Sequence, residues 1–409
     1  MAHARVVVGL DIGTTKVCTL IGEVKPSSPV EVVGVGVSPS RGLRKGLVVD
    51  MEEAAAAVLA SLKKAEVFSG YKIIGAFVSV SGSHMETSPV HGSIALTGGR
   101  AVSRQDLAAV LTAARPVEES GGQRVLQVIP SGYTLDGENG IRNPVGMLGS
   151  HLEVNGVVVR CGDAPLQNVA RCVERSGIQV DGFVPAGLAS SHGVLSDAEK
   201  QLGVILMDLG GGTTDLAWYQ EGDIRYVGAL PVGGNHVTND VSVGLGIPFS
   251  AAEEMKIRFA SAVPANVTVE EVVDAGSFSD GQVRKVSRRY MSEIVEARIC
   301  EIFNLAVEEL EQRGFNGLLP AGVVLTGGGA QLGGIRELAQ QMFNAPVRVG
   351  VPEGLAGTTD SISTPAYAAA AGLLKWVLAQ ADDVAGGRPM RRRVGLAARL
   401  KGLVRAFLP

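Results

Sequence analysis

The 409-residue sequence has no apolar run long enough to cross a membrane and no recognisable secretion signal. Its first apolar run, residues 6–10, leads directly into Asp11 and is too short for the apolar part of a signal peptide. The four cysteines have neither C-x-x-C spacing nor a pattern of histidine partners, which predicts a reduced compartment and no structural metal. Aromatic residues make up only 4% of a chain with 54 glycines, so we expect layered helices and strands joined by tight turns.

Charge is unevenly distributed along the chain. Residues 388–409 contain seven lysines and arginines and no acid. Because the whole chain carries a formal charge of −4, the preceding 387 residues carry −11. An acidic body of this kind argues against a general nucleic-acid binder, so we expect no nucleic-acid partner. The length and the 46% hydrophobic content suffice for two or more domains with a large core.

Two short runs, far apart in the chain, share a pattern of an aliphatic stretch, an aspartate, glycines and paired threonines. The first covers residues 11–16 (Asp-Ile-Gly-Thr-Thr-Lys) and the second covers residues 208–215 (Asp-Leu-Gly-Gly-Gly-Thr-Thr-Asp). A buried strand that ends in aspartate and turns through Gly-Thr-Thr presents backbone N–H groups and hydroxyls at its tip. The pair therefore predicts a phosphate chain held between two turns, with Asp11 and Asp208 steering a hydrated Mg²⁺.

A third glycine-rich run, residues 325–334, follows a predicted strand and opens a predicted helix. Backbone without side chains allows a flat adenine ring and its ribose to lie against it, so this run completes a nucleotide site. The sequence contains no G-x-x-x-x-G-K-[ST] motif, which excludes a P-loop protein.

Strands and helices alternate along most of the chain, a pattern typical of α/β folds. Strands are predicted at 5–10, 17–24, 30–37, 73–80, 178–184, 203–208, 214–219, 224–230 and 321–326. Helices are predicted at 51–68, 165–175, 236–245, 250–261, 287–313, 332–343 and 364–380. Residues 84–162, rich in Ser, Gly and Pro, predict a small inserted subdomain whose helix at 103–114 is capped by Ser103 and Asp106. We therefore expect two similar α/β halves around a cleft.

The order of D-I-G-T-T-K, D-L-G-G-G-T-T-D and T-G-G-G-A resembles the ATPase fold shared by actin, Hsp70-type chaperones and sugar kinases. More narrowly, the chain resembles the FtsA family of bacterial cell-division proteins. The motifs that carry this narrower resemblance are 186–191, 231–240, Glu253-x-x-Lys256 and 367–374 before the basic C-terminal segment. The resemblance covers essentially the whole chain. It implies an actin-like fold, with two duplicated α/β halves and a small inserted α+β subdomain that replaces an actin subdomain.

The resemblance also implies how the chain is divided. The implied parts are a first half (1–83, 163–197 and 364–380), the inserted subdomain (84–162), the core of the second half (198–235 and 314–363), its subdomain (236–313), a linker (381–390) and an amphipathic membrane helix (391–409). ATP and Mg²⁺ are the implied cofactors, with both aspartates acting on the metal through water. The implied nucleotide contacts are Asp11, Gly13, Thr14, Thr15, Lys16, Asp208, Gly210, Gly211, Gly212, Thr213, Gly234, Glu253, Lys256, Gly327, Gly328 and Gly329.

Two of these residues have an alternative interpretation. Glu253 fits equally well as the capping-box partner of Ser250 at a helix start. Lys16 fits as a solvated surface lysine. The sequence also departs from chaperone ATPases, which carry an acid before a proline where this chain has Val184-Pro185. Without a residue to orient the attacking water, hydrolysis should be slowed by about 10²–10⁴-fold, so we assign no catalytic residue and expect slow or no turnover.

The end of the chain predicts an amphipathic helix, with apolar residues at i, i+4, i+7 and i+11 and cations beside or opposite them. The residues of this helix that would meet a membrane are Leu396, Arg399, Leu400, Lys401, Leu403, Val404, Arg405 and Phe407. Such a helix fits an anionic lipid surface, although a helix docked on the protein's own core and a basic nucleic-acid tail are alternatives. One copy is a weak anchor, whereas a filament would raise the apparent affinity by about 10²–10⁴-fold.

The resemblance implies a filament protein that tethers the division ring to the cytoplasmic face of the inner membrane. Its implied partners are other copies of itself, the C-terminal tail of the tubulin-like protein FtsZ, and later division proteins that bind through 84–162. The FtsZ tail would bind the subdomain at 236–313, where Arg288, Arg289 and Arg298 could receive carboxylates or simply form a solvated helix face.

Two enzyme-like functions remain as alternatives. A sugar- or acetate-type kinase would need a positioned base, and Asp215 is the only candidate, although it fits better as part of the strand turn. A chaperone ATPase would need a peptide-binding domain, and the residues after 380 are too few for one.

Overall fold

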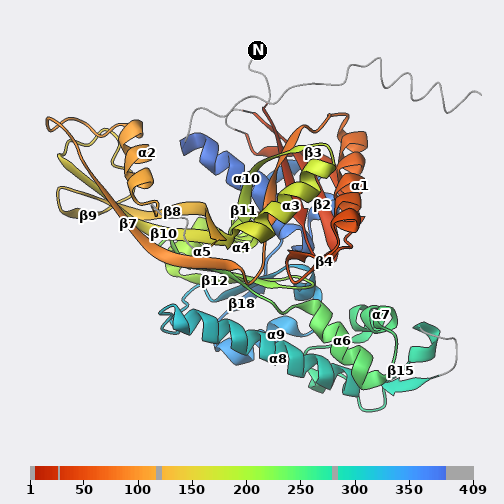
Figure 1. Cartoon of the computed structure of the whole chain (residues 1–409). Helices are drawn as coiled ribbons and strands as arrows, with labels where there is room; N and C mark the ends of the chain where they lie inside the picture. Colours follow the sequence, from red (N-terminus) through yellow and green to blue (C-terminus); the bar gives the residue numbers. More distant parts are fainter. Residues whose placement is uncertain (1–4, 26–27, 117–121, 279–283, 384–409) are drawn as a thin grey trace, which may run out of the picture.

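The computed structural model describes residues 5–25, 28–116, 122–278 and 284–383. Figure 1 shows two α/β halves, with an inserted subdomain on the left that extends away from both. The first half is built on a six-stranded sheet with the order β11-β6-β1-β2-β3-β19. Its strands are β1 (Arg5–Ile12), β2 (Lys16–Val24), β3 (Val30–Pro39), β6 (Gly75–Val80), β11 (Gln179–Pro185) and β19 (Leu355–Gly357).

Helices cover both faces of this first sheet. The helices α1 (Met51–Ser69) and α3 (Asp163–Arg175) pack on one face, and α10 (Ala368–Asp383) packs on the other. Asp50 caps the N-terminus of α1: its carboxylate accepts hydrogen bonds from the backbone N–H groups of Glu52 and Glu53. A short hairpin of β4 (Leu43–Arg44) and β5 (Leu47–Val48) precedes α1.

The second half repeats the first. Its sheet has the order β14-β13-β12-β17-β18. The strands are β12 (Val204–Leu209), β13 (Thr214–Gln220), β14 (Asp223–Leu230), β17 (Val323–Thr326) and β18 (Val347–Val349). β1 and β12 each form an antiparallel hairpin with the next strand, and each has a parallel strand on its other side. The predicted fold class, two duplicated α/β halves, is therefore confirmed.

The inserted subdomain has its own sheet and its own core. The sheet order is β7-β10-β8-β9, with β7 (Met85–Ala95), β8 (Gln123–Leu135), β9 (Glu138–Ile141) and β10 (His151–Gly162). α2 (Arg104–Ala113) packs on this sheet, and Ser103 and Asp106 form the predicted reciprocal cap at its start. Leu152 and Val110 are fully buried between the sheet and the helix.

A helical layer covers the outer face of the second sheet. Its helices are α6 (Gly234–Leu245), α7 (Phe249–Phe259), α8 (Arg288–Gln312) and α9 (Ile335–Phe343), and a two-stranded sheet joins β15 (Val272–Asp274) to β16 (Lys285–Ser287). Figure 1 shows these elements at the bottom of the view. α8 buries a helical stripe that includes Val295, Ile299 and Phe303, and Gly314 with φ of 89° follows its end as predicted.

Two helices lie between the halves, α4 (Ala186–Val194) and α10, and α4 is followed by the short α5 (Asp197–Leu202). Apolar residues of both sheets, including Leu20 and Leu206, share one core with these helices. The two helix backbones approach closely at glycines: a Cβ on Gly372 would lie 1.7 Å from the carbonyl oxygen of Ala189. A Cβ on Gly193 would lie 2.5 Å from the carbonyl oxygen of Ala368.

Most predicted elements occur in the structure, with shifted ends. The helix predicted at 332–343 begins only at Ile335, because residues Gly328–Gln331 form a 3-10 turn and Gly334 adopts a left-handed conformation. The strand β7 and the helix α4 were not predicted. β7 contains Pro89 and glycine, and α4 buries eight of its nine residues, so neither shows the alternation that sequence reasoning needs.

Within the described residues, no helix combines the length and the hydropathy that spanning a membrane requires. α10 continues to Asp383, past the predicted start of the linker at 381. The predicted amphipathic helix at 391–409 lies outside the described residues.

We predict that Gly372→Ala destabilises the protein by about 1–3 kcal/mol, because its methyl group must force α4 and α10 apart. Urea unfolding, followed by circular dichroism, measures this as a lower midpoint. Gly132→Ala is the matched control, since a Cβ there has no atom within 4 Å. Equal midpoints for Gly372→Ala and Gly132→Ala would contradict the close-packed arrangement of the two helices.

Candidate nucleotide site

The first predicted phosphate turn connects β1 to β2 in an antiparallel hairpin. Asp11 lies opposite Cys18 at the end of this hairpin. The backbone N–H of Gly13 donates to the carbonyl oxygen of Lys16 over 3.0 Å and closes the turn. Thr14 and Thr15 therefore lie at the tip, as the Gly-Thr-Thr pattern predicts.

The second turn connects β12 to β13 in the same way, with Asp208 opposite Asp215. The N-terminus of α6 packs against this turn: Gly234 N–H donates to the carbonyl oxygen of Gly210 over 2.9 Å, and Asn235 N–H donates to that of Gly211 over 2.7 Å. A Cβ on Gly233 would lie 2.5 Å from the Gly210 oxygen, so this approach needs glycine.

The two turns face each other across the cleft between the halves. A Cβ on Gly211 would lie 2.4 Å from Cγ2 of Thr15, and one on Gly212 would lie 2.5 Å from Oγ1 of Thr14. Between the turns lies a cavity of about 140 Å³. Residues from both turns line it: Asp11, Gly13, Thr14, Thr15, Lys16, Asp208, Gly210, Gly211 and Thr213.

Three carboxylates line this cavity, and two of them are Asp11 and Asp208. Burial raises the pKa of Asp208 to about 6, with a further contribution from Asp11, and burial also raises the pKa of Asp11. The third is Asp215, whose pKa burial and the neighbouring Asp208 hold well above its usual range. One oxygen of Asp215, Oδ1, is buried without a hydrogen-bond partner in the structure. Such a site suits a divalent cation and a polyphosphate that supplies oxygen ligands.

Lys16 extends from the first turn to the short helical turn Pro365–Tyr367 that precedes α10. Its ammonium donates to the carbonyl oxygen of Ala366 and lies 3.6 Å from the centre of the Tyr367 ring. Burial lowers the pKa of Lys16, against the attraction of Asp11. The interpretation of Lys16 as a solvated surface lysine is therefore wrong.

A second cavity of about 300 Å³ continues from the turns towards α7 and α8. Gly234, Glu253, Lys256, Gly328 and Gly329 line it. Lys256 Nζ donates to Glu253 Oε2 over 2.7 Å and to Thr238 Oγ1 over 2.8 Å. Gly327 packs closely against Asp208, because a Cβ on Gly327 would lie 2.2 Å from Oδ1 of Asp208.

The capping interpretation of Glu253 is wrong. α7 begins at Phe249, directly after Pro248, so Ser250 lies inside the helix and not at its cap. Glu253 instead accepts hydrogen bonds from Lys256 and from the Thr238 hydroxyl.

Sequence reasoning missed three serines at this site. Ser79 Oγ donates to Asp11 over 2.6 Å, and Ser190 Oγ donates to Asp208 over 2.5 Å. Ser81 Oγ donates to Asp215 Oδ2 over 2.8 Å and lies 2.9 Å from Thr213 Oγ1, which joins the two halves. The only signal in the sequence was the Ser-x-Ser at the end of the strand at 73–80 and the Ser-Ser pair at 190–191.

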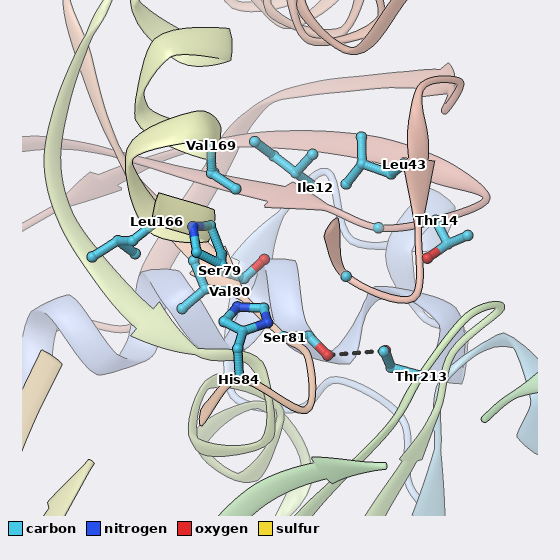
Figure 2. Close-up of a pocket in the computed structure, with 13 residues that line it drawn as sticks. Ile12, Thr14, Leu43, Ser79, Val80, Ser81, His84, Leu166, Val169 and Thr213 are labelled. Carbon is cyan, nitrogen blue, oxygen red and sulfur yellow. Dashed lines mark hydrogen bonds between the residues drawn. The ribbon is translucent and has the colours of Figure 1, made fainter. Parts of the chain in front are cut away.

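Figure 2 shows a small side cavity of about 40 Å³ behind the first turn. The hydrogen bond between Ser81 and Thr213 lies on its border, and the His84 ring and Leu166 also line it. Burial lowers the pKa of His84, so the ring is neutral at pH 7. This side cavity shares Thr14 and Ser79 with the larger cavity between the two turns and therefore adjoins it.

Val184 and Pro185 end β11, and Val184 is fully buried in the core between the halves. Val184 therefore occupies the position before the proline where chaperone ATPases carry an acid. Asp215, which sequence reasoning assigned to the strand turn, lies in β13, and its carboxyl group lines the cavity between the two turns.

Solved structures confirm the predicted actin-like ATPase fold. The PilM–PilN type IV pilus biogenesis complex aligns with a TM-score of 0.61 and 16% identity, over 90% of this chain and 97% of that chain. MreB5 of Spiroplasma citri bound to ADP aligns with a TM-score of 0.54 and 17% identity, over 94% and 99%.

The chain belongs to the FtsA family of cell division proteins. The family model "Cell division protein FtsA" matches residues 205–372, and the model "SHS2 domain inserted in FTSA" matches residues 82–160. Cell division protein FtsA of Pseudomonas aeruginosa is 41% identical over 93% of this chain and 91% of its own length. The protein of the same name in Escherichia coli K12 is 38% identical, over 91% and 90%. The predicted family is confirmed.

We predict that Asp208→Asn stabilises the nucleotide-free protein at pH 7. Because the pKa of Asp208 is about 6 in the folded protein and 3.8 ordinarily, the folded state binds this proton more tightly. Its contribution to stability is therefore present below pH 3.8 and is lost as the pH rises to about 6. Asparagine stays neutral, so the urea midpoint of the variant should rise relative to wild type across this window.

Asp197→Asn is the control for this pH experiment, because it removes the same charge from an exposed side chain. A difference between Asp208→Asn and wild type that is the same at pH 4 and pH 7 would show that Asp208 does not titrate as described.

Proposed function

We propose that the protein is an ATP-binding, actin-like division protein that forms filaments and tethers the FtsZ ring to the cytoplasmic face of the inner membrane. The observation that carries the nucleotide part is the pair of facing turns, in which Gly211 and Gly212 of the second turn lie close to Thr15 and Thr14 of the first. Two structures of the same fold, from Spiroplasma citri, are titled as bound to ADP and to AMPPNP, which supports a nucleotide in this cleft.

ATP and Mg²⁺ fit the residues that surround the cleft. The orphaned carboxylate oxygen of Asp215 and the raised pKa values of the site's aspartates indicate a site that needs a cation. Asp11 and Asp208 would hold Mg²⁺ through water, and the metal would neutralise phosphate charge. The two turns would bind the phosphates, and Gly234, Glu253, Lys256 and the glycines at 327–329 would hold the adenosine.

We propose that this site binds ATP without rapid hydrolysis. The position before Pro185 is a buried valine, which supplies no group to orient water. The energy of binding is then available to favour one arrangement of the two halves over another.

Lys16→Met should weaken Mg-ATP binding by at least about tenfold, since a hydrogen bond to a charged group contributes about 1.5–3 kcal/mol. Calorimetric titration measures the affinity. Lys25→Met is the matched control, because Lys25 forms an exposed ion pair with Glu31 away from the site. If Lys16→Met and Lys25→Met bind Mg-ATP equally well, Lys16 does not contact phosphate.

The partner regions follow the division of the chain proposed from its family. The helical layer at 236–313 would bind the FtsZ tail, and the inserted subdomain at 84–162 would bind later division proteins. The arginines on α8 already have partners: Arg288 pairs with Glu271, and Arg298 pairs with Asp240 over 2.5 Å. Arg289 lies 3.7 Å from Glu293, the longest of the three ion-pair distances. An acidic tail that binds Arg289 would therefore have to break the weakest of the existing ion pairs.

The amphipathic segment at 391–409 would anchor the protein, after a linker at 381–390. Apolar side chains at Leu396, Leu400, Leu403 and Phe407 would enter the acyl boundary, while the neighbouring cations meet anionic headgroups. Because one such helix binds weakly, filament formation and membrane binding should be coupled.

Phe407→Glu should move the protein from the membrane to the soluble fraction, since it places a charge in the apolar arc. Co-sedimentation with vesicles of phosphatidylglycerol and phosphatidylethanolamine measures this. Pro409→Glu is the control, because it adds the same charge outside the arc. If Phe407→Glu sediments with the vesicles as wild type does, the tail is not a membrane anchor.

A further inference from the structure

Two buried serine hydroxyls each donate a hydrogen bond to one of two aspartates, Asp11 near the end of β1 and Asp208 near the end of β12. Ser79 Oγ donates to Oδ1 of Asp11 over 2.6 Å, and Ser190 Oγ donates to Oδ2 of Asp208 over 2.5 Å. Ser79 is 4% exposed and Ser190 is fully buried. Neither serine side chain makes another hydrogen bond among the described residues, so each hydroxyl serves one carboxylate only.

The two hydroxyls come from different kinds of element. Ser79 lies on β6, the parallel neighbour of β1, where the register places it beside Asp11. The corresponding neighbour of Asp208 on β17 is Thr326, but its hydroxyl donates to backbone carbonyl oxygens of Gly350 and Pro365 instead. The helix α4 supplies the hydroxyl of Ser190 in its place. The same contact is thus made twice on a duplicated fold by non-equivalent residues.

A carboxylate rotates easily about its last side-chain bond, because that torsion has broad minima. One hydroxyl donor removes this freedom and leaves the second oxygen in a fixed place. For Asp208 the second oxygen, Oδ1, is also confined by Gly327, where a Cβ would lie only 2.2 Å away. Water molecules around a cation need acceptors at fixed positions, and the free oxygens of both aspartates can provide them.

We propose that Ser79 and Ser190 are positioning residues that orient Asp11 and Asp208 for a hydrated cation bound with the nucleotide. The inference rests on the proposed function, because it concerns the same site. It assigns to the serines no contact with the nucleotide itself.

The test compares Mg²⁺-dependent and Mg²⁺-independent nucleotide binding in Ser79→Ala and Ser190→Ala. Calorimetric titration with ATP is run once with Mg²⁺ and once with EDTA. Partners that orient metal-binding groups typically change metal affinity by 10–100-fold, so each variant should lose about that factor with Mg²⁺ and little with EDTA. A general defect in folding would lower both affinities alike.

The chain offers matched controls for both serines. Ser191 is the next residue on α4 and is equally buried, but its hydroxyl lies 2.6 Å from that of Tyr219. Ser61 on α1 is also fully buried, and it donates to the carbonyl oxygen of Gly36 over 2.8 Å. Ser191→Ala and Ser61→Ala remove a buried hydroxyl without touching either aspartate, so the ratio of their affinities with Mg²⁺ and with EDTA should remain that of wild type.

Ser190→Cys keeps the shape of the side chain, with a somewhat larger sulfur atom, and replaces the hydroxyl by a weak donor, so it should show the same selective loss even if Ser190→Ala unfolds. The serine inference is overturned if wild type binds Mg-ATP and the variants Ser79→Ala, Ser190→Ala and Ser190→Cys all keep the Mg²⁺ dependence of wild type. If wild type itself binds no Mg-ATP, the proposed function fails together with this inference.

Discussion

The grouping of three aspartates between two similar half-molecules, Asp215 buried and Asp11 and Asp208 half-buried, is the constraint on which the rest of this structure depends. Asp11, Asp208 and Asp215 line one cavity, and burial raises the pKa of each. Carboxylates that are grouped together and partly removed from water cost stability, and other parts of the fold must offset that cost. The glycines of α4 and α10 bring the halves together, and the large cores on both sides hold them there.

The same site is joined to the inserted subdomain. β6 ends at Val80, Ser81 bonds to the second phosphate turn, and β7 of the insertion begins at Met85. The return strand is fixed at the same place, because Gly162 N–H donates to the carbonyl oxygen of His84 over 3.0 Å. A change in the distance between the phosphate turns would therefore act directly on both connections of the subdomain that the proposed function assigns to later partners.

The sequence revealed the strands and glycine turns of the site because their patterns are local. Asp11, Asp208 and the glycine runs were recognised from an aliphatic stretch followed by a tight turn. The structure brings both aspartates and the other predicted glycines to the two cavities of one cleft, whereas Gly212 lies against Thr14 and lines neither cavity. The serine contacts could not be predicted, because Ser79 and Ser190 meet their aspartates only after β6 and α4 have packed. The capping interpretation of Glu253 failed for a related reason: its partner Thr238 lies on the neighbouring helix α6, although Lys256 is only three residues further along α7.

The central claim is that a cation and a nucleotide together compensate the buried carboxylates. The unfolding temperature of the full chain with ATP alone, with Mg²⁺ alone and with both tests it most directly. A ligand that binds the folded state at 100 times its dissociation constant stabilises by about 2.7 kcal/mol, so the account predicts a clear rise in unfolding temperature with Mg-ATP that exceeds the separate effects of ATP and Mg²⁺. An unfolding temperature that stays the same in all three conditions would contradict it.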